Sequence, residues 1–315
     1  MLHSLKTTRL FGIVMLTVLV LGTIVSSAGA GIVRESETRE PQKFAILIAI
    51  DRYHDEHLPT LKYCKSDALA LKDTLIAGGF QEKNIILMTD DAEEFHLVPT
   101  KSNIRRVIIN LENLVSEGDM VCFFFSGCGG NRDGLSILLP IDSIVYRSQW
   151  VGSLKIQEVL DTLGRCKAES RLIVLDACLG GSNVNPLILP EKTAVLLAEK
   201  GGGLSYESPV LQGSVFTHYM IRGLQGEADE IGDENGKVDL TELFHYVKSH
   251  MIKHKEFQTR PLVPGLLVSN DMEDIFGLEI VDLESPTPKT GSVTIESISD
   301  SESQTDVEFV YEVSK

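Results

Sequence analysis

Two cysteines stand where apolar runs of the sequence end, at the place where parallel strands present binding or catalytic groups. Cys128 follows the apolar run 120–125, and Cys178 follows the run 172–175. In a doubly wound α/β sheet, the loops at the carboxyl ends of neighbouring strands form the ligand crevice, so we expect the two thiols to face one another across a cleft. A thiol attacks as its thiolate, which a neighbouring imidazole helps to form. The sequence has no histidine beside either cysteine.

The composition predicts a globular protein of one large or two modest domains. The chain has 315 residues, of which 43% are hydrophobic and 23% charged, and a chain of this kind can bury a proper core. Its net charge of −16 argues against nucleic acids and anionic membrane surfaces as partners, because phosphate binding needs clustered Lys and Arg. A basic peptide would be attracted instead. The five cysteines are too few and too irregularly spaced to indicate a disulfide framework.

Residues 1–30 are typical of a secretory signal peptide. Lys6 and Arg9 precede the apolar stretch 10–25, and small residues follow at 26–30, as they do before a signal cleavage site. The uncharged sequence continues to residue 33, so the alternative is an uncleaved membrane anchor formed by residues 10–33. With either, we expect an exported or extracytoplasmic protein, in which residues 31–43 form a linker.

The hydrophobic pattern alternates between strand and helix, which predicts an α/β fold. Residues 44–50 are apolar throughout, as in a parallel strand covered on both faces. We expect further strands at 84–88, 120–128, 135–140, 171–175 and 193–198, and helices at 66–77, 104–115, 154–163, 216–224 and 240–254. The compact domain should span 44–280. The acidic, Ser- and Thr-rich tail 281–315 has the composition of a flexible segment, although 307–313 could form a strand if a partner edge exists.

Several short segments carry a further signal through their order and spacing. In chain order they are AIDRY at 49–53, CKSDA at 64–68, FFFSG at 123–127, ILLPID at 137–142, VLDAC at 174–178, SYE at 205–207 and GSVFT at 213–217. Together they resemble the caspase and metacaspase family of cysteine peptidases, in its bacterial form. The resemblance covers about 44–265 and implies a caspase-like three-layer α/β/α sandwich with a mostly parallel central sheet.

The resemblance also implies a cysteine-type endopeptidase with one altered position. Cys178 matches the nucleophile, and backbone groups near Gly180 match the donors that stabilise the oxyanion. The family carries its general-base histidine where this chain has Cys128. A thiol replaces imidazole poorly, because it becomes an anion where a cation is wanted and would raise the pKa of Cys178. Loss of a proton-transfer group lowers a rate by ~10² to 10⁴-fold, so we expect impaired activity.

Three hypotheses follow from the missing histidine. The fold is kept for binding, as a pseudopeptidase or scaffold that recognises basic peptides. Alternatively, another histidine reaches Cys178 and acts as the base. The best candidates are His54 and His57, in the loop after the first strand. The other interpretation of these two histidines is that they are solvated loop residues. As a feature of either, Cys128 and Cys178 form a disulfide in an oxidising compartment, provided that their Cα atoms come within ~7 Å.

Two aspartates predict the preferred substrate. In the metacaspase-like branch, carboxylates at the positions of Asp67 and Asp176 line the pocket for the residue before the cut, and both are present here. The resemblance therefore implies a protein or peptide substrate with Arg or Lys at that position, since paired carboxylates suit a guanidinium. The alternative is that Asp67 only caps its helix and Asp176 orients the nucleophile loop.

An acidic turn before the last predicted helix resembles a calcium-binding EF-hand loop. Asp233, Asn235, Asp239 and Glu242 fall at ligand spacings, but Ile231 occupies the first ligand position. The sequence therefore predicts no metal and no other cofactor, with calcium as the alternative.

Overall fold

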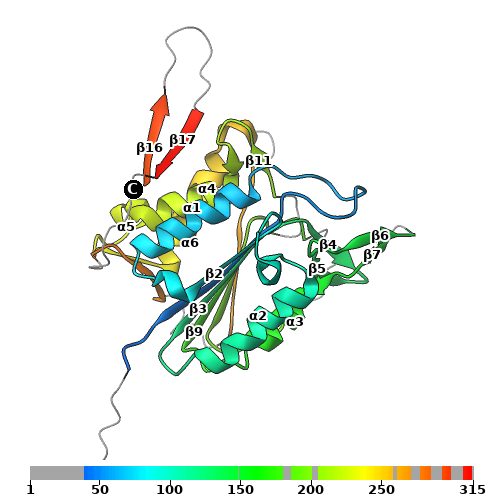
Figure 1. Cartoon of the computed structure of the whole chain (residues 1–315). Coiled ribbons are helices and arrows are strands. Elements are labelled where there is room, and N and C mark those ends of the chain that lie inside the picture. The colour runs from blue at the N-terminus through cyan, green and yellow to red at the C-terminus, as the bar shows by residue number, and fades with distance from the viewer. Residues whose placement is uncertain are drawn as a thin grey trace, which may run out of the picture. The chain divides into compact units, whose positions relative to one another are not determined.

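A six-stranded sheet forms the centre of the protein (Figure 1). The computed structural model describes residues 39–147, 149–179, 186–200, 205–257, 261–270, 277–284, 293–298 and 308–313. The sheet order is β14-β10-β9-β3-β1-β2. Its strands are β1 (Lys43–Ala49), β2 (Ile85–Thr89), β3 (Met120–Gly127), β9 (Ser170–Ala177), β10 (Thr193–Leu197) and β14 (Gly265–Val268). All neighbours pair in parallel except β10 and β14, which are antiparallel.

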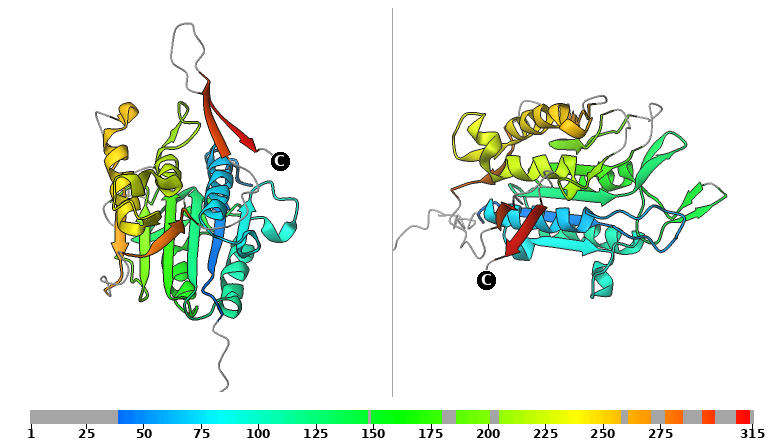
Figure 2. Two further views of the ribbon diagram at one scale, coloured as in Figure 1. Left: turned by 90° about the vertical axis from the view of Figure 1, so that its left-hand side faces the viewer. Right: turned by 90° about the horizontal axis from the view of Figure 1, so that it is seen from above.

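Helices cover both faces of this sheet (Figure 2). The helices α1 (Cys64–Ala77), α4 (Val215–Arg222) and α6 (Leu240–Lys253) pack on one face, and α2 (Lys101–Leu114) and α3 (Ile156–Leu163) pack on the other. Side chains of β3 alternate between the two cores: Phe124 joins the first, whereas Phe123 and Phe125 join the second. Burial on both faces explains why the strands are apolar throughout. The predicted three-layer sandwich with a mostly parallel sheet is confirmed.

The remaining elements are short and extend or connect the three layers. The strands are β4 (Gly129–Arg132), β5 (Leu135–Leu138), β6 (Ile144–Tyr146), β7 (Gln149–Val151), β8 (Leu154–Lys155), β11 (Glu207–Ser208), β12 (Gly213–Ser214), β13 (Lys237–Asp239) and β15 (Glu279–Asp282). Helical turns are η1 (Glu82–Asn84), η2 (Phe95–Leu97), η3 (Gly223–Glu227), α5 (Ala228–Glu230) and η4 (Lys255–Phe257). The turn at Asp133 and Gly134 joins β4 to β5, with positive φ at both residues as a tight hairpin turn requires.

Helix α1 begins at Cys64, two residues before the predicted start at Ser66. The Cys64 N–H donates to Asp51 Oδ1 (2.9 Å), and the Tyr63 N–H donates to Glu207 Oε1 (2.9 Å). The Ser66 hydroxyl instead donates to the Tyr63 carbonyl oxygen. Carboxylates stabilise a helix N-terminus because its first N–H groups lack partners within the helix. Here one comes from the loop after β1 and the other from β11 (Glu207–Ser208), which local spacing cannot indicate.

Two strands lie within the predicted tail. β16 (Val293–Ile298) and β17 (Glu308–Val313) pair with each other in antiparallel register, from Val293 with Val313 to Ile298 with Glu308. Residues 293–298 thus supply a partner edge for the strand considered at 307–313. The predicted signal peptide and the anchor alternative at 10–33 lie outside the described residues. Within the part of the chain that is described, no helix has the length and apolar character needed to cross a membrane.

Replacement of Leu47 by alanine tests the core between the sheet and α1. Leu47 is fully buried in β1, so we expect Leu47→Ala to lower the free energy of unfolding by about 2 to 5 kcal/mol, through lost burial and the cavity left behind. The matched control is Leu69→Ala on α1, whose side chain is 41% exposed and whose loss should cost less than about 1 kcal/mol. Urea unfolding of both variants measures the difference. Equal losses would contradict this packing.

Candidate active site

The pairing of β3 with β9 brings the two strand-end cysteines together. Gly127 and Ala177 are paired in the parallel register, and Cys128 and Cys178 are the next residue of each chain segment. The backbones stay in contact beyond the strands: a Cβ atom on Gly129 would lie 3.0 Å from the Cys178 carbonyl oxygen and 2.9 Å from that of Ile137. Only glycine fits this close approach.

Both cysteines line one cavity of about 260 Å³ at the carboxyl ends of these strands. One part of its wall is apolar and includes Leu58, Leu61, Leu139 and Trp150. The polar part carries three thiols and three carboxylates, from Cys64, Asp67, Cys128, Asp176, Cys178 and Glu207. No Lys, Arg or His is among the described residues that line the cavity. The described part of the wall therefore gathers acidic groups without a basic side chain.

Asp67 and Asp176 are both held in the cavity wall by hydrogen bonds. Each is only 3% exposed. Asp67 Oδ2 accepts from the Ser214 N–H (2.8 Å), while Asp176 accepts from the Thr217 hydroxyl (2.5 Å) and from the Ser205 hydroxyl. A Cβ atom on residue 213 would lie 2.7 Å from Asp67 Oδ1, and that residue is glycine. These contacts fix the carboxylates in place and orient them.

Burial raises the pKa of both aspartates. The pKa of Asp67 lies well above its usual range, chiefly through desolvation, and the negative charges of Asp176 and Glu207 add to the rise. Desolvation likewise raises the pKa of Asp176, although hydroxyl donors including Ser205 and Thr217 oppose it. Like charges in a desolvated site disfavour ionisation, and a cation entering the site would favour it. The cavity is thus suited to a positively charged group.

The thiols are protonated at neutral pH for the same physical reason. Burial raises the pKa of Cys178. It raises the pKa of Cys128 to about 11, and negative charge on Cys178 adds to that rise. The Cys178 thiol lies 3.9 Å from the Ser205 carbonyl oxygen, a weak interaction with a neutral group. The ionised, nucleophilic form of Cys178 is therefore scarce at neutral pH.

The two histidines proposed as substitute bases lie outside the cavity wall. His54 and His57 are exposed, and His57 Nδ1 lies 2.7 Å from Asp55 Oδ1 in the same loop. Neither lines the cavity. Their loop is at the carboxyl end of β1, as predicted from the sequence, but the contact with Asp55 holds the His57 ring in solvent with 79% of the side chain exposed. The structure does not bring these histidines together with Cys178.

Two residues beside the cysteines were not singled out from the sequence. The Tyr53 hydroxyl accepts the Cys128 N–H at 2.6 Å and so fixes the loop that carries Cys128. Glu207 lines the cavity from β11. Both lie within the motifs AIDRY and SYE, so the signal was present, but only the tertiary structure gives them these contacts. Gly180, expected at the oxyanion site, lies outside the described residues.

Comparison with known proteins assigns this arrangement to a family. Residues 42–268 match the sequence profile of the caspase domain. The chain belongs to the caspase domain family. It is 31% identical over 150 residues to metacaspase-1 of Eremothecium gossypii, covering 44% of this chain and 32% of that protein. It is 26% identical over 196 residues to metacaspase-1 of Cryptococcus neoformans (55% and 41%) and 24% identical over 211 residues to that of Schizosaccharomyces pombe (60% and 48%).

The caspase domain accounts for most of this chain but for only part of the relatives. The alignments span about a third to a half of the length of the metacaspases named above. The family resemblance expected from the order of the sequence motifs is confirmed. Within this caspase domain, the loop after β3 carries Cys128 and the loop after β9 carries Cys178.

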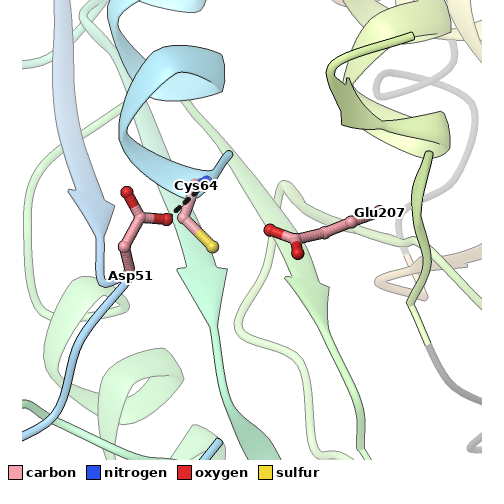
Figure 3. Close-up of side chains that lie close together, drawn as sticks. All are labelled: Asp51, Cys64 and Glu207. Carbon is pink, nitrogen blue, oxygen red and sulfur yellow. Dashed lines mark hydrogen bonds between the residues drawn. The ribbon is translucent and has the colours of Figure 1, made fainter. Parts of the chain in front are cut away.

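Three side chains at the start of α1 could together offer ligands to a metal ion (Figure 3). Ligand atoms of Asp51, Cys64 and Glu207 lie within 4.8 Å of one another. Both carboxylates, however, accept N–H groups at the helix start: Asp51 from Cys64, and Glu207 from Lys62 (2.8 Å) and Tyr63. Helix capping therefore explains their position in this caspase domain.

The acidic turn before α6 brings Asp229, Asp233 and Glu242 within 4.8 Å of one another. Asp229 accepts the N–H groups of Asn235 and Gly236, and Glu242 accepts those of Asp233 and Asp239. The Asp239 side chain in turn accepts the Glu242 N–H, which completes a capping box at the start of α6. These hydrogen bonds explain why acidic residues cluster in this turn.

Alkylation measures how strongly the site disfavours the thiolate. Because burial raises the pKa of Cys178, we expect its rate of reaction with iodoacetamide to rise about tenfold per pH unit from about pH 6 to beyond pH 9. Peptide mapping assigns the label to Cys178. Cys128→Ala should leave this pH dependence in place, because Cys128, with a pKa raised to about 11, is itself protonated over this range. A rate already constant from about pH 7 would contradict a raised pKa.

Proposed function

We propose that this protein is a cysteine-type endopeptidase homologue that takes an Arg or Lys side chain into the acidic cavity and attacks the following peptide bond with Cys178. One observation carries the proposal: the residue at the nucleophile position and two buried carboxylates line the same cavity. Membership in the caspase domain family supports the peptidase chemistry. Protein or peptide substrates follow from that family.

Electrostatics favour a basic residue in this site. Asp67, Asp176 and Glu207 line the cavity, and no Lys or Arg among the described residues lines it with them. Desolvation makes it costly to ionise Asp67 and Asp176 in the empty site. A guanidinium or ammonium group would offset this cost, and a guanidinium can bind two carboxylate oxygens at once. The net charge of −16 would also attract basic segments from solution.

The presence of Cys128 at the position of the general base determines the rate that we expect. In the proposed reaction, the Cys178 thiolate attacks the carbonyl carbon, and the leaving amine needs a proton. With Cys128 at the position of the general base, water must take the proton from Cys178 and supply one to the amine. Positioned proton-transfer groups contribute ~10² to 10⁴-fold. We therefore expect the proposed enzyme to be slower by about that factor than an enzyme in which a histidine assists the nucleophilic cysteine.

A second candidate function is peptide binding without hydrolysis. It is favoured by the cavity lining, in which no described residue is a histidine, and by the raised pKa of both strand-end thiols. A pseudopeptidase of this kind would keep the same preference for basic peptides. The two candidates differ only in whether the peptide bond is cut.

Hydrolysis of fluorogenic Arg and Lys peptides under reducing conditions separates the two candidates. We expect slow turnover that is abolished in Cys178→Ala and raised ~10² to 10⁴-fold in Cys128→His, because imidazole restores proton transfer. Cys128→Ala is the matched control, since it removes the thiol without adding a base. Turnover is measured both with added calcium and with a chelator, because a calcium requirement is the alternative to a metal-free site. No turnover by the parent protein, together with measurable peptide binding, would favour the non-cutting candidate.

Asp67→Asn tests the proposed pocket. Loss of one charge-assisted contact should weaken binding of an Arg peptide by about 10 to 100-fold, the equivalent of about 1.5 to 3 kcal/mol. Fluorescence anisotropy of a labelled Arg peptide on the Cys178→Ala background measures this without hydrolysis. Asp73→Asn, on the same helix but away from the cavity, is the control. Undiminished binding in a folded Asp67→Asn variant would exclude the acidic pocket.

A further inference from the structure

The pairing of β3 with β9 places Cys128 and Cys178 on neighbouring chain segments. They directly follow Gly127 and Ala177, which are paired in adjacent parallel strands. Such strands lie about 4.8 Å apart, and the Cα atoms of a disulfide are usually about 4.4 to 6.8 Å apart. The close approach of Gly129 to the Cys178 carbonyl oxygen keeps the two segments in contact past the strand ends. The general spacing of paired strands thus falls within the range that a disulfide spans.

The other cysteines are less well placed for such a bond. Cys122 packs in the core on one face of the sheet and Cys166 in the core on the other. Cys64 also lines the cavity, but it packs with the core that contains α1. Cys178 is the one cysteine of the five that is not buried, and Cys128 lies beside it in the same cavity. The two cysteines thus line one cavity, and Cys178 is the more exposed of them.

We propose that Cys128 and Cys178 form a reversible disulfide across the cavity, with a small-molecule disulfide such as oxidised glutathione as the oxidant. The more exposed Cys178 thiolate attacks one sulfur of the oxidant and releases one molecule of its thiol. The Cys128 thiolate then attacks the Cys178 sulfur and releases the second. Two protein thiols are oxidised to one disulfide, the oxidant is reduced to two thiols, and the two protons lost by the protein pass through solvent to the leaving thiolates.

The disulfide would block the sulfur atom of Cys178, which is the proposed nucleophile. Its formation does not depend on the proposed function; only the resulting loss of hydrolysis does. Burial raises the pKa of both cysteines, that of Cys128 to about 11. Thiol–disulfide exchange runs through thiolates, so oxidation is slow near neutral pH and becomes faster as the pH rises. Imidazole at position 128 could not take part, which makes this property specific to the Cys128 substitution.

Mass spectrometry of the folded, full-length protein tests the proposal. After incubation with oxidised glutathione, we expect the intact mass to fall by two hydrogen atoms. Tryptic digestion without reductant should join peptide 107–132, which carries Cys122 and Cys128, to peptide 172–192, which carries Cys178. The cross-link should be absent in Cys128→Ser and Cys178→Ser and present in Cys166→Ser. Iodoacetamide should fail to label Cys178 in the oxidised protein and should label it again after dithiothreitol.

Three results would overturn the proposal. They are two free thiols after equilibration with excess oxidant, a stable adduct of Cys178 with one glutathione, and a disulfide that contains Cys64. The outcome is independent of the proposed function, since the mass is read without substrate. If the disulfide forms in a protein that never hydrolyses peptides, the proposed peptidase function is wrong and the proposed disulfide stands. If the protein hydrolyses peptides but forms no disulfide, the proposed disulfide is wrong and the proposed function stands.

Discussion

The parallel pairing of β3 with β9 fixes the relative position of the groups in the cleft. The two strands pair over eight residues, from Met120 with Ser170 to Gly127 with Ala177. Their side chains alternate between two different helical layers, so a shift of one residue would exchange every side chain between the two cores. Such a shift would also separate the loops that follow, because Gly129 fits closely against the Cys178 carbonyl oxygen. The cavity chemistry therefore depends on the packing of the sheet.

The second constraint on this site is that its buried carboxylates have no positively charged partner among the described residues that line the cavity. Asp67 and Asp176 are almost completely buried and accept hydrogen bonds from neutral hydroxyl and N–H donors. These donors offset part of the desolvation cost, but they do not neutralise the carboxylates, whose pKa values remain raised. An arrangement of this kind is costly when empty and becomes favourable when a cation enters. The same residues that destabilise the empty cavity would select its ligand.

A thiol at position 128 gives this cleft a different chemistry from the imidazole that the family resemblance implies there. Imidazole beside a thiol can carry positive charge and lower the pKa of that thiol. Cys128 can carry only negative charge, and its own pKa is raised to about 11. The loop that holds it is nevertheless fixed, since the Tyr53 hydroxyl accepts its N–H. The cleft therefore carries a second sulfur atom, that of Cys128, in the same cavity as Cys178.

The sequence by itself determined the fold class, the family and the two strand-end cysteines, because apolar runs, helical spacing and motif order are local or ordered along the chain. It also placed the loop of His57 at the correct end of the sheet. Only the tertiary structure decided where that ring points, toward Asp55 and solvent. It likewise decided that Asp51 and Glu207 cap α1 and that Tyr53 holds the loop after β3. The contacts of Glu207 with Tyr63 and of Tyr53 with Cys128 join residues far apart in the chain. Even the short-range contact between His57 and Asp55 has a direction that no local pattern encodes.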